Sequence, residues 1–154
     1  MAFADYRLRV PLRVRWAEAD MQGVVFNGHY LTYCDVAVTE YWRAIGLKYP
    51  QELLAGGSDT FVRKATIEYF AAAHYDDELF ICARAAQLGR SSMRVMLELF
   101  RQNDLEHALI AAELVYVNAD PSAKKSVPWS DRVRTLIRNF ETLAPDEVAA
   151  DGGR

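Results

Sequence analysis

Two carboxylates and a polar Asn-Gly pair lie close together in the stretch EADMQGVVFNGHY, residues 18 to 30. An ionised carboxylate such as that of Asp20 can act as a general base or as a nucleophile. A helix that begins near Asn27 would add unpaired backbone N–H groups, which stabilise a developing oxyanion. The spacing therefore predicts a functional site in which a carboxylate lies beside backbone N–H donors.

Each of these residues also has a purely structural interpretation. Asp20 taken alone could be a capping or turn aspartate. Glu18 could be a solvated charge or a group that supports the site from behind, and we favour both over a catalytic role. Asn27 could serve only as the helix N-cap, or its side chain could orient substrate or water.

Other site chemistries find no support in the sequence. The chain has no G-x-S-x-G elbow, which argues against a Ser-His-Asp triad. Cys34 and Cys82 lack the spacing of a metal or redox motif, so we expect both to be reduced and buried. His29 is expected at the surface or at an interface. We predict no metal site.

The elements that flank the site differ in their hydrophobic period. Residues 6 to 16 alternate, which predicts a strand, and Pro11 favours an edge position or a bulge. Residues 30 to 45 repeat along one helical face, and Gly46 suits the C′ position that ends a helix. The sequence predicts one apolar face on this strand, with mostly arginines opposite, made of Leu8, Val10, Leu12, Val14 and Trp16.

Four strand-like segments and a final helix follow. The strands cover residues 60 to 72, 78 to 88, the region of Met93 to Leu99, and 107 to 118, with tight turns between them. In the first of these, Phe61 is expected to share a face with Ala65, Ile67, Tyr69 and Ala71. The last helix is predicted to begin near Pro128. The fold class is α+β, an antiparallel sheet curled around the long helix.

Length and charge set the broad class. A chain of 154 residues predicts one domain, residues 1–144, followed by a disordered tail, residues 145–154. A net charge of −3 and a pI of about 5.6 make nucleic acid an improbable partner. No signal-like segment and no membrane-spanning apolar stretch occur, so we expect a cytoplasmic protein with no membrane span.

Residues 14 to 46 resemble the hotdog-fold acyl-CoA thioesterases of the 4-hydroxybenzoyl-CoA thioesterase family, which includes the YbgC-like enzymes. The resemblance extends more weakly to about residue 120, through TFVRKATIEYFAAAHYDDEL and LGRSS. YbgC-like members commonly carry His at the position of Asn27 and Arg at that of Val38. The family pattern is D/E-x-D, two spacers, G-[IV]-V, an aromatic, a polar residue, a tyrosine and a later acid. It falls here on Glu18, Asp20, Gly23, Val24, Val25, Phe26, Asn27, Tyr30 and Asp35.

This resemblance implies a hotdog fold, with a five-stranded antiparallel sheet around a long central helix and a C-terminal helix. It implies hydrolysis of acyl-CoA, with Asp20 as the catalytic carboxylate and the N–H near Asn27 as the oxyanion donor. Coenzyme A is then part of the substrate, and no cofactor is expected. A homodimer or homotetramer is implied, with the site at the subunit interface. The implied substrate-binding residues are Gly23, Val25, Phe26, Tyr30, Phe61, Arg90 and Ser91.

Three alternatives remain open at this stage. The same machinery could hydrolyse acyl-carrier-protein thioesters. A catalytically silent acyl-CoA-binding protein is a second alternative, although binding alone does not need the carboxylate of Asp20. A hotdog dehydratase is the third, but its His and acid pattern is not found.

Overall fold

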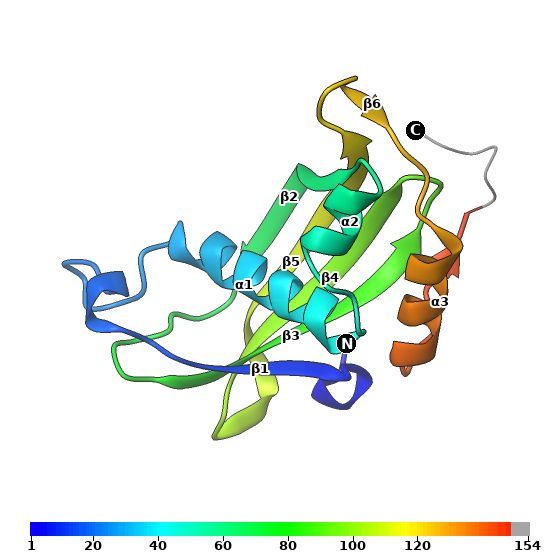
Figure 1. Ribbon diagram of the computed structural model, residues 1–154. Helices are drawn as coiled ribbons and strands as arrows, with labels where there is room; N and C mark the ends of the chain where they lie inside the picture. Colours follow the sequence, from blue (N-terminus) through cyan, green and yellow to red (C-terminus); the bar gives the residue numbers. More distant parts are fainter. Residues whose placement is uncertain (149–154) are drawn as a thin grey trace.

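Residues 1–148 are described by the computed structural model, and they form an antiparallel sheet curled around a long helix (Figure 1). The main strands stand in the order β1-β3-β4-β5-β2, with every neighbouring pair antiparallel. The predicted α+β hotdog architecture is confirmed. The main elements are β1 (Leu8–Arg13), α1 (His29–Ala44), β2 (Asp59–Tyr69), β3 (Glu78–Leu88), β4 (Ser92–Arg101), β5 (Asp104–Asp120) and α3 (Asp131–Phe140).

Shorter elements complete the chain. Two-residue strands β6 (Lys125–Ser126) and β7 (Asp146–Glu147) pair with β5 and β3, antiparallel and parallel respectively. The remaining elements are the 3-10 helices η1 (Phe3–Asp5) and η2 (Trp16–Glu18) and the short helix α2 (Gln51–Ala55).

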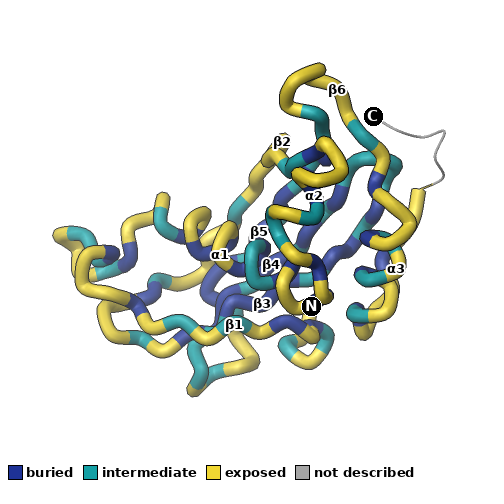
Figure 2. Tube along the Cα trace, in the orientation of Figure 1, coloured by how far each residue is buried: buried dark blue, intermediate teal, exposed yellow. Residues whose placement is uncertain are grey.

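The long helix α1 buries the predicted apolar face against the sheet (Figure 2). Gly46 has φ +96°, the left-handed conformation that a C′ glycine adopts without strain, so the predicted helix end is confirmed. The buried residues of α1 are Tyr30, Tyr33, Cys34, Ala37, Val38, Tyr41 and Trp42.

Within residues 1–148, β1 pairs with β3 alone and is an edge strand, as Pro11 predicted. Leu8 and Val14 are buried, but Trp16 is 83% exposed, so the prediction that Trp16 shares their face is wrong. The alternation fails because the strand ends at Arg13 and the chain turns into η2.

The opposite edge of the sheet is β2, and a bulge there overturns one predicted face. The register with β5 shifts between Val62 and Lys64. Directly paired residues share a face, so Ala65 and Ile67 lie on the helix side, while Phe61 lies on the outer side. The prediction that Phe61 shares their face is therefore wrong.

Part of the predicted tail is ordered. Asp146 and Glu147 form β7 against β3, and Glu147 pairs with Arg138 at 2.8 Å and Arg134 at 3.4 Å. The rest of the predicted tail, residues 149–154, lies outside the described residues. No helix within residues 1–148 is long and apolar enough to cross a bilayer.

Candidate active site

The residues between Glu18 and Phe26 form a small hairpin that presents Asp20. The backbone N–H of Asp20 donates to the carbonyl of Val24 at 2.9 Å, and the backbone N–H of Phe26 donates to the backbone carbonyl of Glu18 at 3.0 Å. Gly23 closes the turn with φ +77°, a conformation that side chains other than glycine rarely adopt. The hairpin therefore fixes Asp20 close to the start of α1.

The carboxylate of Asp20 has one oxygen in the turn and one available. Oδ1 accepts the backbone N–H of Gln22 at 2.8 Å, so the turn role weighed from the sequence is present. No hydrogen bond to Oδ2 occurs within residues 1–148. The side chain is partly exposed in a shallow, mainly apolar hollow that Trp16 and Met21 also line. A structural role for one oxygen thus leaves the other free for chemistry.

Unpaired backbone donors lie at the start of α1. The N-cap is Gly28, not Asn27 as predicted, and no side chain caps this end. The shift arises because His29 N–H bonds to the carbonyl of Phe26 at 2.9 Å, which adds a turn before the helix. A Cβ on Gly28 would come within 3.0 Å of the Phe26 ring, so glycine suits this position. Among the described residues, the N–H groups of Asn27 and Gly28 find no backbone acceptor.

The side chain of Glu18 joins the start of the hairpin to Arg15 and to Tyr33 of α1. Its carboxylate accepts the backbone N–H of Arg15 at 2.8 Å, the guanidinium of Arg15 at 2.6 Å and the hydroxyl of Tyr33 at 2.9 Å. Burial raises the pKa of Glu18, but these hydrogen bonds lower it more, so the pKa lies below the ordinary 4.5. Glu18 is 7% exposed, so the interpretation as a solvated charge is wrong.

Two of the residues expected to bind substrate instead connect the hairpin to the loop before β3. Val25 N–H donates to the carbonyl of Ala73 at 2.8 Å, and Ala73 N–H donates to the hydroxyl of Tyr30 at 3.0 Å. The side chains of Val25 and Tyr30 are each only 3% exposed. In this chain they position backbone rather than line an open surface.

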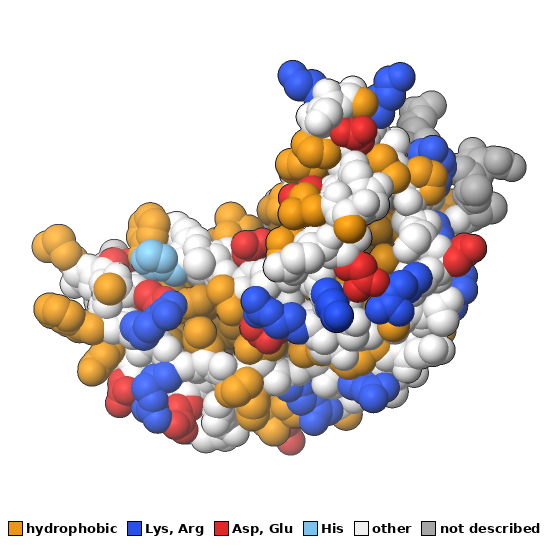
Figure 3. All heavy atoms as spheres, in the orientation of Figure 1, with side chains coloured by type: hydrophobic (Ala, Val, Ile, Leu, Met, Phe, Trp, Pro, Cys, Tyr) orange, Lys and Arg blue, Asp and Glu red, His pale blue; other side chains and the backbone are white. Residues whose placement is uncertain are grey.

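Apolar side chains project around the start of α1 (Figure 3). Phe26 is 50% exposed and packs edge-on against His29. Trp16 and Met21 line the hollow beside Asp20. Neither was predicted as a site residue, because Trp16 was assigned to the apolar face of the first strand and Met21 to a spacer of the motif. Their adjacency to the acidic motif was the available signal.

The structure does not bring Phe61, Arg90 and Ser91 to Asp20 within one chain. Phe61 lies on the outer face of β2. Arg90 and Ser91 form the turn after β3, whose 11 residues separate that turn from the loop beside the hairpin. Such a strand spans roughly 35 Å. Within this chain, the three residues therefore do not adjoin Asp20.

The two cysteines are not placed to act as nucleophiles or metal ligands. Burial raises the pKa of both Cys34 and Cys82 to about 12, so these thiols are unreactive near neutral pH. Both are buried and free, as predicted. Within residues 1–148 no three His, Cys, Asp or Glu side chains are grouped to hold a metal ion.

Comparison with known proteins identifies the family. The YbgC acyl-CoA thioester hydrolase of Escherichia coli O6:H1 is 35% identical over 120 residues, covering 76% of this chain and 85% of that protein. The PA5185 protein of Pseudomonas aeruginosa PAO1 superposes with a TM-score of 0.79 at 26% identity, covering 92% of this chain and 96% of its own. A thioesterase of Thermus thermophilus, solved with coenzyme A and Zn, has a TM-score of 0.76 at 25% identity, covering 90% and 97%.

The similarity to YbgC holds although Asn27 and Val38 differ from the residues common in that branch. The sequence model of the thioesterase superfamily matches residues 22–108, which include Gly23 to Tyr30 and the loop before β3. The chain therefore belongs to the thioesterase superfamily.

Proposed function

We propose that this chain hydrolyses acyl-CoA thioesters, releasing free CoA and a carboxylic acid. The observation that carries the proposal is the free oxygen of Asp20 on a hairpin that leads directly to the unpaired N–H groups of Asn27 and Gly28. The E. coli relative is an acyl-CoA thioester hydrolase, and the T. thermophilus structure contains coenzyme A. Both support CoA esters as the substrate class.

The proposed chemistry uses the carboxylate and the helix start together. Asp20 either deprotonates a water that attacks the thioester carbonyl, or attacks that carbonyl itself to form an anhydride that water then cleaves. In both routes the carbonyl oxygen becomes an oxyanion, and the N–H groups of Asn27 and Gly28 donate to it. The C–S bond breaks as CoA leaves as a thiolate, and a proton from the attacking water restores the thiol. No cofactor takes part in this scheme.

The test is thiol release from short, long and aryl acyl-CoAs and from an acyl-carrier-protein ester, by wild type and Asp20→Asn. The amide oxygen of Asn keeps the acceptor for Gln22, so the fold should be retained. We expect kcat to fall by about a thousandfold or more with an unchanged Tm.

The matched control is Asp120→Asn. Asp120 Oδ1 accepts Ser122 N–H at 2.8 Å in a similar turn that lies in the connection from β5 to β6. Its kcat should equal that of wild type. Turnover of Asp20→Asn at the wild-type rate would reject the mechanism. Turnover of acyl-carrier-protein esters alone would mean that the substrate is a carrier-bound thioester and not acyl-CoA. Binding of acyl-CoA without turnover would mean that the protein binds acyl-CoA and does not hydrolyse it.

We also infer a homodimer or homotetramer. The strand β2 forms one edge of the sheet, and its exposed apolar side chains have no cover within the described chain. An uncovered apolar edge strand favours pairing with a second copy. Such an assembly would offer Phe61, Arg90 and Ser91 to the site of a neighbour. Light scattering after size exclusion tests it, and a monomer that still hydrolyses acyl-CoA would reject it. The exposed residues are Phe61, Val62, Tyr69 and Phe70.

A further inference from the structure

The hairpin that carries Asp20 is attached to the loop of residues 70–77 rather than directly to a strand of the main sheet. Val25 N–H donates to Ala73 at 2.8 Å, and Val24 forms a single bridge with His74. Tyr30, in the first turn of α1, accepts the N–H of Ala73 at 3.0 Å. The position of Ala73 therefore affects both the hairpin and the start of α1.

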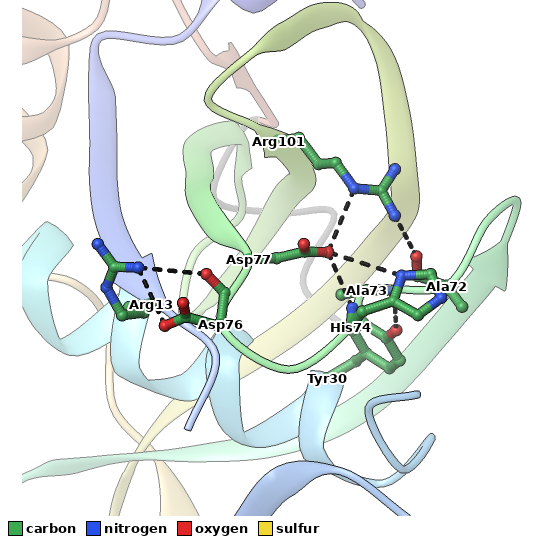
Figure 4. Close-up of polar contacts among 8 residues, drawn as sticks. All are labelled: Arg13, Tyr30, Ala72, Ala73, His74, Asp76, Asp77 and Arg101. Atoms are coloured by element: carbon green, nitrogen blue, oxygen red, sulfur yellow. Dashed lines mark hydrogen bonds and ion pairs between the residues drawn. The ribbon is translucent and has the colours of Figure 1, made fainter. Parts of the chain in front are cut away.

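Arg101 fixes that loop on both sides of Ala73. Its Nη2 donates to the carbonyl of Ala72, and its Nε donates to Oδ2 of Asp77 at 3.2 Å. The same carboxylate oxygen accepts the N–H of His74 at 2.8 Å. Figure 4 shows Arg101 above the loop, with Tyr30 approaching Ala73 from the other side.

The guanidinium is suited to this contact because its donors point in fixed directions within one plane. Arg101 is the last residue of β4 and pairs with Leu79 of β3, so its backbone belongs to the rigid sheet. The side chain lines a surface hollow together with Arg13 and Asp77 and is 28% exposed. Among the described residues, the side chain makes no hydrogen bond or ion pair with residues 18–26.

We propose that Arg101 is a positioning residue for thioester hydrolysis, acting through Asp77 and Ala73 to align Asp20 with the oxyanion donors. The proposal rests on the proposed function. Loss of Arg101 would let the loop and the hairpin shift, and small displacements of reacting groups reduce kcat strongly. Substrate binding would change little, because Arg101 does not line the hollow beside Asp20.

The experiment compares Arg101→Ala with Arg132→Ala. Arg132 also donates to one carboxylate and one carbonyl: its Nε donates to Glu52, and its Nη2 donates to the carbonyl of Gly46 at 3.5 Å. These contacts join α3 to the region after α1, away from the hairpin. We expect Arg101→Ala to lower kcat by about 10- to 100-fold, with KM within about threefold of wild type. Arg132→Ala should keep the wild-type kcat.

Three further readouts separate positioning from general stability. Guanidinium at low millimolar concentration should restore part of the kcat of Arg101→Ala, because the hollow is open to solvent. Arg101→Lys keeps the charge but loses the planar fork, so its kcat should lie between those of wild type and Arg101→Ala. Hydrogen exchange of residues 18–30 should accelerate in Arg101→Ala and not in Arg132→Ala.

The outcomes also distinguish this proposal from the proposed function. Wild-type kcat in Arg101→Ala, or a change in KM alone, would overturn the positioning role and leave the thioesterase proposal intact. Unchanged exchange at residues 18–30 would overturn it independently of activity. If Arg101→Ala does not fold, Arg101→Lys decides, and an unchanged kcat there overturns the proposal. If the wild type releases no thiol but hydrogen exchange of residues 18–30 still accelerates in Arg101→Ala, the proposed thioesterase activity is rejected. The effect of Arg101 on the hairpin would then still stand.

Discussion

Two buried glutamates near opposite ends of α1 have similar neutral hydrogen bonds and differ in one charged partner. Glu18 accepts a hydroxyl from Tyr33 at 2.9 Å and a backbone N–H at 2.8 Å. Glu141 accepts a hydroxyl from Tyr41 at 2.6 Å and a backbone N–H at 2.8 Å. The second oxygen of Glu18 accepts the guanidinium of Arg15 at 2.6 Å, whereas that of Glu141 is buried without a partner within the described residues.

The pKa shifts of the two carboxyl groups have opposite directions. For Glu18, hydrogen bonds outweigh burial and the pKa falls below 4.5. For Glu141, burial dominates and the pKa rises above 4.5. Glu18 is thus a stable anion behind the Asp20 hairpin, while ionised Glu141 costs stability far from the site. Arg84 and Arg7 also lower the pKa of Glu141, but neither donates a hydrogen bond to it in the described residues, and burial prevails. A directly hydrogen-bonded guanidinium, as at Glu18, offsets burial more effectively than a cation at a distance.

The largest effect in this comparison is expected from Glu18→Gln. The neutral amide weakens the contacts from Arg15 and Tyr33, so the free energy of unfolding should fall by about 1–3 kcal/mol. Because the hairpin then shifts, kcat should fall by about tenfold or more. Thermal unfolding and thiol release measure the two quantities.

Glu52→Gln is the matched control. Glu52 also accepts an arginine, Arg132, and a backbone N–H, that of Lys48 at 3.0 Å, but it lies in α2. The Glu52→Gln variant should have a lower free energy of unfolding than wild type and an unchanged kcat. An unchanged kcat in Glu18→Gln would show that Glu18 supports only the fold.

A smaller effect, of opposite sign, is expected from Glu141→Gln. Its amide oxygen keeps both donors and the cost of a buried charge disappears, while the amide N–H₂ takes the buried position of Oε2 without a partner in the described residues. Stability near neutral pH should therefore rise by at most about 1 kcal/mol. The pKa of Glu141 is raised in the folded state, so its contribution is present below 4.5 and is lost as the pH rises through the folded pKa. The advantage of Glu141→Gln should therefore vanish in acid.

Glu18 should show the reverse pH dependence. Its folded pKa is lowered, so its stabilisation is present above 4.5 and is lost as the pH falls through the folded pKa. Melting temperatures of wild type and both variants from about pH 3 to about pH 8 test the two signs together. Differences that stay constant with pH would contradict the assignment of charge to both sites.

Much of this arrangement follows from local sequence. The face of α1, its end at Gly46 and the alternation around Met93 to Leu99 depend on residues close in the chain, and the structure agrees. Asp20 and Asn27 could be placed near one another because only a hairpin separates them. The burial of Glu18 could not be predicted, since it depends on Tyr33 in the next helix.

Other features depend on pairing across the fold. The face of Phe61 changes at a bulge that exists only in the register with β5. Arg101 acts on residues 72 to 77, which lie in a different turn of the sheet. Glu141 accepts Tyr41 from 100 positions away in the chain. Periodicity carries no information about such contacts.

The smallest expected effect separates the tyrosines. Tyr33→Phe removes one neutral donor from a carboxylate that keeps its guanidinium, so we expect a loss of about 0.5 kcal/mol. Tyr41→Phe leaves ionised Glu141 with a single N–H donor, and its loss should exceed that of Tyr33→Phe by about 0.5–1 kcal/mol. Denaturant unfolding measures both near neutral pH. The double variants, Tyr33→Phe with Glu18→Gln and Tyr41→Phe with Glu141→Gln, give the interaction energy of each tyrosine–glutamate pair. A larger loss in Tyr33→Phe would mean that the hydroxyl, and not Arg15, keeps Glu18 charged.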